Sequence, residues 1–113
     1  MECYRIEKLE FENTLFTTFT DTFLITMEES LRRKEYMYEL QKWRPTKNVY
    51  IIHNKGFRHC AKNNVQNSAQ DLWHANKEIF KLASDIESPI LILEDDVKFT
   101  QNIFNHATEI ENF

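Results

Sequence analysis

The chain has 113 residues, 42% of them hydrophobic and 28% charged, so it suits one globular domain and is too short for two. Its formal net charge of −4 comes from acidic and basic residues interspersed along the chain. This distribution argues against a general nucleic-acid binder, because such proteins draw their affinity from a basic face.

The start of the chain and its cysteines indicate where the protein works. No signal-peptide pattern, with a basic start and an apolar core, precedes Phe11. Cys3 and Cys60, the only cysteines, lie far apart in the sequence. No apolar run approaches the roughly 20 residues that cross a bilayer. We therefore expect a protein of the reducing cytoplasm, with no membrane span of its own.

The first half of the chain predicts a strand, a helix and a second strand. Residues 22–27 are typical of a strand and end in the turn Glu28-Glu29-Ser30. Apolar residues then recur at helical spacing: Leu31, Tyr36, Met37, Leu40 and Trp43. Residues 44–47, which include a proline, end this helix. Residues 49–52 form a continuous apolar run, as in a buried parallel strand.

The second half repeats the alternation. The polar stretch of residues 53–67 predicts a loop, and Asn67 or Ser68 is expected to cap a second helix. One face of that helix carries Leu72, Ala75, Ile79, Ala83 and Ile86. Pro89 breaks the chain before a third strand at residues 90–93, and an amphipathic stretch around Ile103, Phe104 and Ile110 closes the sequence.

The resulting order, β-α-β-α-β-α, predicts an α/β domain with a mostly parallel sheet and helices on both faces. We expect one domain over residues 1–113, with its core at about residues 22–99 and an incomplete C-terminal end. In such sheets ligands bind beyond the carboxyl ends of the strands.

Three carboxylates, Glu94, Asp95 and Asp96, follow the third strand. Like charges this close raise the cost of ionisation unless a cation or hydrogen-bond donors compensate, so the motif favours a hard metal such as Mg²⁺ or Mn²⁺. An isolated acidic triplet is more often a solvated turn. Here the aliphatic strand that precedes the triplet favours a position in a cleft for at least one of the carboxylates. On an extended chain Glu94 and Asp96 share one face and Asp95 points the other way.

The sequence PILILEDDV at residues 89–97 resembles the "LEDD" motif of the lipopolysaccharide-type and related viral glycosyltransferases of the GT-A fold. Residues 23–37 are similar to the strand, turn and arginine-containing helix start with which that family binds its nucleotide. Residues 68–80 lie where the family has the helix before its acidic motif. Thr26-Met27-Glu28 stands where the family usually has Asn-Leu-Asp.

The resemblance implies a GT-A (Rossmann-like) half domain. It also implies a metal-dependent glycosyltransferase, or its nucleotide-sugar-binding part, that uses a nucleoside-diphosphate sugar of the UDP or GDP type. The motif acids would bind Mn²⁺ or Mg²⁺, with Asp96 as the first ligand beside Glu94 and Asp95. The metal would neutralise the departing diphosphate.

The same resemblance assigns contacts with the nucleotide sugar. The residues concerned are Thr26, Glu28, Arg33, Glu94 and Asp95. Arg33, at the start of the first helix, would reach the diphosphate with the help of the positive helix end. An exposed helix cation is the alternative interpretation of Arg33. No catalytic residue is assigned, and the acceptor, whether glycan, lipid or protein, stays open.

The other polar and aromatic residues are expected to be solvated or to lie in the core, and the histidines are expected to be solvated loop or helix residues. The histidines lack zinc-like spacing: His53, His59, His74 and His106. Lys55, Arg58 and Lys62 are expected in a solvated basic loop. Trp73 and Phe80 are expected in the core. Asp71 and His74 lie near the positions of two polar residues in the family's helix, and neither of them is assigned a role.

Two other classes of protein remain open. The strand and its acids also resemble the opening strand of a response-regulator receiver, which binds Mg²⁺ and accepts phosphate on an aspartate. A receiver needs most of a domain after that strand, which argues against it. A non-catalytic nucleotide-binding remnant is the second alternative, because acceptor-binding residues normally follow the acidic motif. A second copy or another chain is then expected to complete the cleft.

Overall fold

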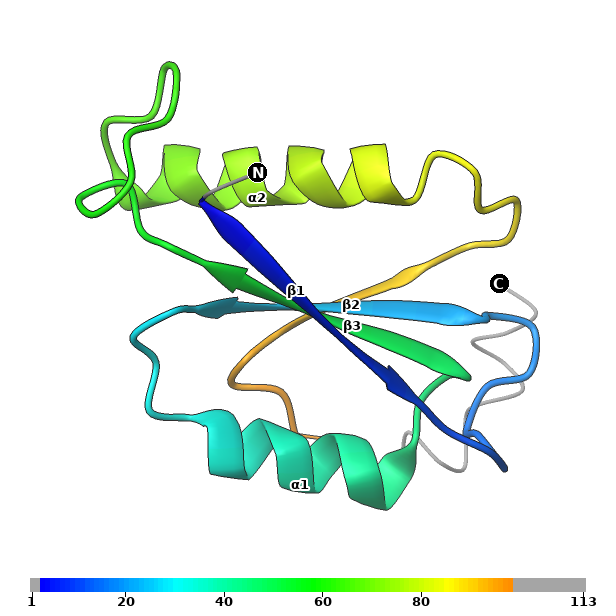
Figure 1. The fold of residues 1–113 in the computed structure, drawn as a ribbon. Coiled ribbons are helices and arrows are strands. Elements are labelled where there is room, and N and C mark those ends of the chain that lie inside the picture. The colour runs from blue at the N-terminus through cyan, green and yellow to red at the C-terminus, as the bar shows by residue number, and fades with distance from the viewer. Residues whose placement is uncertain (1–2, 99–113) are drawn as a thin grey trace.

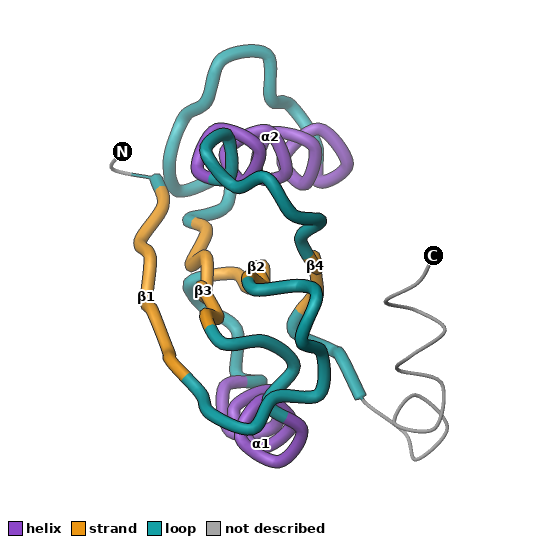
Figure 2. Tube along the Cα trace, turned by 90° about the vertical axis from the view of Figure 1, so that its right-hand side faces the viewer, coloured by secondary structure: helices purple, strands orange, loops and turns teal. Residues whose placement is uncertain are grey.

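One mixed β-sheet organises this computed structural model, which describes residues 3–98. The elements are β1 (Tyr4–Glu10), β2 (Asp21–Met27), α1 (Arg33–Trp43), β3 (Asn48–Asn54), α2 (Ser68–Leu82) and β4 (Leu91–Glu94). The strand order is β1-β3-β2-β4, with β2 parallel to both β3 and β4. The helices cover opposite faces of the sheet (Figures 1 and 2). The predicted α/β class and the parallel pairing are confirmed.

Strand β1 is the element that the sequence analysis missed. It pairs antiparallel with β3 at the edge of the sheet, so the sheet is mixed. Its sequence, YRIEKLE, has no continuous apolar run, and most of its residues are partly or fully exposed. Charged side chains are common on edge strands, where they discourage pairing with other chains. The predicted closing stretch around Ile103, Phe104 and Ile110 lies outside the described residues.

The core lies on both faces of β2 and β3. On the α2 side it consists of Phe23, Ile25, Ile52, Ala75 and Ile79. On the α1 side it consists of Leu24, Tyr36, Leu40, Val49 and Ile51. Successive strand residues point to opposite faces, so a strand covered on both sides is largely apolar, and buried polar residues such as Thr22 and Thr26 make hydrogen bonds. This explains why both strands could be predicted from short apolar runs.

Helix α1 begins later than the sequence predicted. Leu31 lies before the helix and is 97% exposed, so its assignment to the helix's apolar face is wrong. The end at Trp43 is as expected: Arg44 adopts the left-handed conformation, with φ 45°, and Pro45 follows. A residue before proline is disfavoured in the α region. Helix α2 is capped by Asn67, whose side chain accepts a hydrogen bond from the Gln70 amide at 2.9 Å, as predicted.

Trp73 and Phe80 do not lie in the core, so that expectation is wrong. Their exposed fractions are 62% and 53%. The face of α2 that packs on the sheet is set by Asp71, Ala75 and Ile79, which recur every four residues. Both aromatic rings lie off that stripe. Neither helix in the described part of the chain has the length and apolar character needed to cross a membrane.

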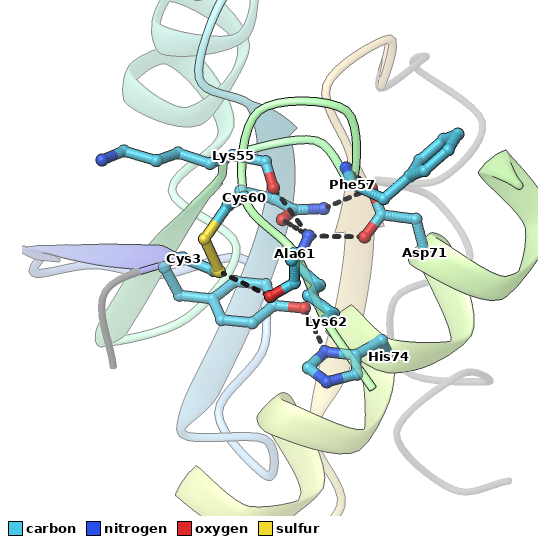
Figure 3. Close-up of a disulfide and its surroundings, with 10 residues drawn as sticks. Cys3, Lys55, Phe57, Cys60, Ala61, Lys62, Asp71 and His74 are labelled. Carbon is cyan, nitrogen blue, oxygen red and sulfur yellow. Dashed lines mark hydrogen bonds and ion pairs between the residues drawn. A yellow bond between two sulfur atoms is a disulfide. The ribbon is translucent and has the colours of Figure 1, made fainter. Parts of the chain in front are cut away.

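Lys62, expected in a solvated loop, is buried. Its ammonium donates to Asp71 Oδ1 at 2.5 Å, to Asn54 Oδ1 at 2.7 Å and to the Lys55 carbonyl at 2.6 Å. The side chains of Lys62 and Asp71 are 0% and 6% exposed. The reason is the position of Asp71 on the core-facing stripe of α2, where an unpaired carboxylate would be costly. The loop is therefore drawn inward over the end of the sheet (Figure 3).

A disulfide between Cys3 and Cys60 closes the same region (Figure 3). Their Cα atoms are 5.8 Å apart although 57 positions separate them in the sequence. The antiparallel edge strand makes this pairing possible, because the Lys55 amide donates to the Cys3 carbonyl at 2.8 Å and brings the two segments together. The expectation of a reducing cytoplasm rested partly on the large sequence separation, and the observed pairing removes that ground.

Replacing Lys62 by Met should lower the free energy of unfolding by about 3–5 kcal/mol, because Asp71 would remain buried without its cation. Urea unfolding of the variant and the parent measures the difference. Lys81→Met is the matched control, since Lys81 pairs with Glu78 while 72% exposed and should matter by less than about 1 kcal/mol. Equal losses in the two variants would contradict a buried Lys62–Asp71 pair.

Candidate functional site

The acidic motif lies at the carboxyl end of the parallel strands. Glu94 is the last residue of β4, and it stands opposite Ile25 of β2 in the strand register. Asp95 and Asp96 then leave the sheet beside Thr26 and the turn that joins β2 to α1. Parallel pairing therefore brings the predicted metal motif next to the predicted opening motif.

Asp95 is held by two hydroxyl groups of that turn. Its Oδ2 atom accepts hydrogen bonds from Thr26 Oγ1 and Ser30 Oγ, both at 2.9 Å. Thr26 is only 2% exposed, so the carboxylate is anchored to a rigid part of the sheet. The structure thus brings together two of the residues predicted to contact the nucleotide sugar, Thr26 and Asp95.

Glu94 and Asp96 differ from Asp95 in their surroundings. Both are exposed, and their carboxylates have no hydrogen-bond partner among residues 3–98. No three His, Cys, Asp or Glu side chains in the described segment gather closely enough to hold a metal ion by themselves. The protein therefore offers two open carboxylates here and one that is already satisfied.

A cleft of about 380 Å³ separates the acidic motif from α1. Asp95, Asp96 and Val97 line one side, and Glu35, Tyr38 and Glu39 of α1 are among the residues that line the other. The cleft also contains three cationic side chains: Arg32, Lys34 and Lys98. Glu94 is not among the lining residues.

Arg32 and Lys34 were missed because the sequence alone does not fix the rotation of the helix start. Residues 32–34 are three consecutive cations, of which the resemblance singled out Arg33. Arg32, the residue before the helix, lines the cleft together with Lys34, whereas Arg33, the first helical residue, turns toward Glu7. The sequence therefore showed a run of three basic residues, but it did not show which of them line the cleft.

Arg33 points toward the opposite edge of the sheet. Its guanidinium donates to both carboxylate oxygens of Glu7 on β1, at 2.7 and 2.8 Å, and to the Tyr36 hydroxyl at 3.4 Å. Strand β1 lies at the far edge from β4 (Figure 2). Glu28 also turns to that side and pairs with Arg5 at 3.3 Å. The structure therefore does not bring Arg33 and Glu28 to the acidic motif.

Glu7 is the centre of a polar cluster on β1. Besides Arg33, the buried His53 ring approaches it, with Nε2 at 3.0 Å from Glu7 Oε1. The hydrogen bond from Arg33 is the main cause that lowers the pKa of Glu7 from 4.5 to about 2, with a further contribution from His53 against the opposing effect of burial. The same hydrogen bond raises the pKa of Arg33. His53, expected in a solvated loop, is therefore structural.

Glu7→Gln should cost about 1 kcal/mol of stability at neutral pH, a value discounted for the solvent that screens the half-exposed Arg33. Because folding lowers the pKa of Glu7, its contribution is complete above pH 4.5 and disappears as the pH falls through about 2. Denaturant unfolding across that range should show parent and variant converging in acid. Glu12→Gln, at an exposed position, is the control and should leave the acid limb unchanged.

Comparison with known proteins does not identify a family for this chain, so its function is inferred from the geometry of the site. No protein-family model, curated protein or solved structure matches the chain. The relevant observations are therefore the two open carboxylates, the anchored Asp95 and the three cations of the cleft. Together they place acidic and basic side chains side by side at one edge of the sheet, on a chain whose overall charge is negative.

Proposed function

We propose that this chain is the nucleotide-sugar-binding part of a metal-dependent glycosyltransferase with a GT-A-like arrangement. The nucleoside diphosphate of a UDP- or GDP-type donor would bind in the cleft between α1 and the acidic motif, with Mn²⁺ or Mg²⁺. The observation that carries the proposal is the anchoring of Asp95 by Thr26 and Ser30. It fixes the motif at the strand ends, where α/β sheets bind ligands.

The metal would be held by Asp96, the open carboxylate that lines the cleft, with diphosphate oxygens and water completing its coordination. Hard divalent cations prefer carboxylate and phosphate oxygens, and Mg²⁺ sites often combine one or two carboxylates with substrate phosphates. Asp95, whose Oδ2 is occupied by two hydroxyl groups, has a positioning role. When bound, the metal would stabilise the charge that develops on the departing diphosphate.

The side chains on the other walls of the cleft suit the remainder of the donor. Arg32, Lys34 and Lys98 would offset the negative charge of the diphosphate, which the carboxylates of the cleft, Glu35, Glu39, Asp95 and Asp96, would repel without the metal. Tyr38 is 60% exposed and lines the same cleft, so its ring is available for stacking with the nucleobase. The site thus combines a metal position, phosphate partners and a base platform.

A nucleoside diphosphate together with Mn²⁺ should raise the melting temperature, and neither alone should match the pair. A ligand at a hundred times its dissociation constant adds roughly 2.7 kcal/mol to native-state stability. Thermal unfolding with uridine, guanosine, cytidine and adenosine diphosphates measures the effect. Asp96→Asn should abolish the shift without lowering the stability of the unliganded protein, whereas Asp85→Asn, at another exposed position, should preserve it.

A complete lack of shift with all four nucleotides would contradict the proposal. Stabilisation by acetyl phosphate or beryllofluoride with Mg²⁺, in place of nucleotides, would instead support a phosphate-accepting protein of the receiver type.

Arg32→Ala should weaken nucleotide binding about tenfold, since a hydrogen bond to a charged group contributes roughly 1.5–3 kcal/mol. Arg33→Ala is the matched variant one position further along, where the side chain pairs with Glu7 and does not line the cleft. It should lower stability and leave nucleotide affinity unchanged. Titration calorimetry of both variants decides between the two positions, and the reverse pattern would place the diphosphate on the β1 side of the helix.

A further inference from the structure

A second cleft, of about 430 Å³, lies beyond the carboxyl ends of β2 and β3, on the face of the sheet that α2 covers. Ile25, Met27 and Leu72 provide its apolar floor. Gly56 shapes one wall, because a Cβ atom there would lie 3.0 Å from the Met27 methyl carbon. A larger residue would require the Met27 side chain to shift.

Hydrogen bonds hold the part of the cleft that is formed by Phe57 and Asp71. Asp71 accepts hydrogen bonds from the Phe57 amide at 3.2 Å and from Lys62, so the loop is tied to the start of α2. Asn54 is engaged in the same network. Figure 3 shows the Phe57 ring directed away from this network. The buried polar groups therefore hold the shape of the cleft, and they are already hydrogen-bonded within the protein.

Four polar side chains of the same cleft have no such partners. They are Glu29, Arg58, His59 and Ser68. None makes a side-chain hydrogen bond or an ion pair with another described residue. Arg58 instead lies over the ring of Phe57, with 5.6 Å between the guanidinium carbon and the ring centroid. Acceptors and donors thus surround an apolar and aromatic surface.

This combination fits a carbohydrate better than other small ligands. A pyranose has an apolar C–H face and a rim of hydroxyl groups, each of which donates and accepts hydrogen bonds. Phe57 and the aliphatic floor match the face, and Glu29 and Arg58 match the rim. A purely anionic ligand would meet the Glu29 carboxylate, and a purely apolar one would leave the polar side chains desolvated without partners.

We propose that this second cleft binds the acceptor, a glycoside whose hydroxyl group receives the sugar; the inference rests on the proposed function. Glu29 lines the second cleft, while its neighbour Ser30 holds Asp95 in the first. A single turn, residues 28–32, therefore contributes side chains to both clefts, Glu29 to the second and Arg32 to the first. Transfer requires the acceptor next to the donor sugar, and this shared turn is the basis for placing the acceptor here. Phe57 would support the sugar ring, and Glu29 and Arg58 would orient its hydroxyl groups.

The test uses the full chain and methyl glycosides of glucose, galactose, mannose and N-acetylglucosamine as probes. Amide chemical-shift changes in NMR titrations should cluster at residues 56–59 and at Glu29. Arg58→Ala and Phe57→Ala should each weaken glycoside binding about tenfold and leave the binding of uridine or guanosine diphosphate with Mn²⁺ unchanged. Phe80→Ala, an exposed aromatic position on α2, is the control and should affect neither ligand.

The possible results separate this inference from the proposed function. Binding of nucleotide with Mn²⁺ but of no glycoside would overturn the acceptor site alone. Binding of a glycoside but of no nucleotide would overturn the glycosyltransferase proposal and the acceptor role with it. Loss of nucleotide binding in Arg58→Ala, a variant at an exposed position, would show that the nucleotide occupies this cleft and would also overturn the inference.

Discussion

The structure depends on the burial of β2 between two parallel neighbours and two helices. Because β3 and β4 both run parallel to it, the carboxyl ends of three strands meet at one edge of the sheet. The faces of β2 carry different parts of the core, Phe23 and Ile25 toward α2 and Leu24 toward α1. A shift of one residue in its register would reverse these faces, so the apolar pattern fixes where the strand ends.

The polar groups at that edge fall into two kinds. Asp71 is paired with Lys62, and Asp95 with Thr26 and Ser30, so their charges are compensated within the protein. Such groups define the shape of the site, since a partly satisfied buried network would be costly. Glu94, Asp96, Glu29 and Arg58 lack comparable partners among residues 3–98. The proposed ligands lie beside side chains of this second kind, Asp96 in the first cleft and Glu29 and Arg58 in the second.

The antiparallel edge strand gives the two sides of the sheet different roles. β1 contributes Glu7, which holds Arg33 by an ion pair at 2.7 Å, and it brings Cys3 to Cys60. These contacts stabilise the side of the sheet away from β4. The β4 side instead carries the acidic motif and the first cleft. Arg33 is thereby committed to the β1 side, whereas its neighbour Arg32 lines the first cleft, 3.6 Å from the carboxylate of Glu35.

The sequence by itself determined the alternation of strands and helices and the position of the acidic motif at a strand end. Apolar runs in β2 and β3, the Asn67 cap and the stop at Pro45 are local signals, so they could be predicted from neighbouring residues. Only the tertiary structure decided the edge strand, the burial of Lys62, the exposure of Trp73 and the disulfide. Each of these depends on segments that are distant in the sequence. The choice of Arg32 over Arg33 has the same origin, because the rotation of α1 is set by the packing of Tyr36 and Leu40 against the sheet.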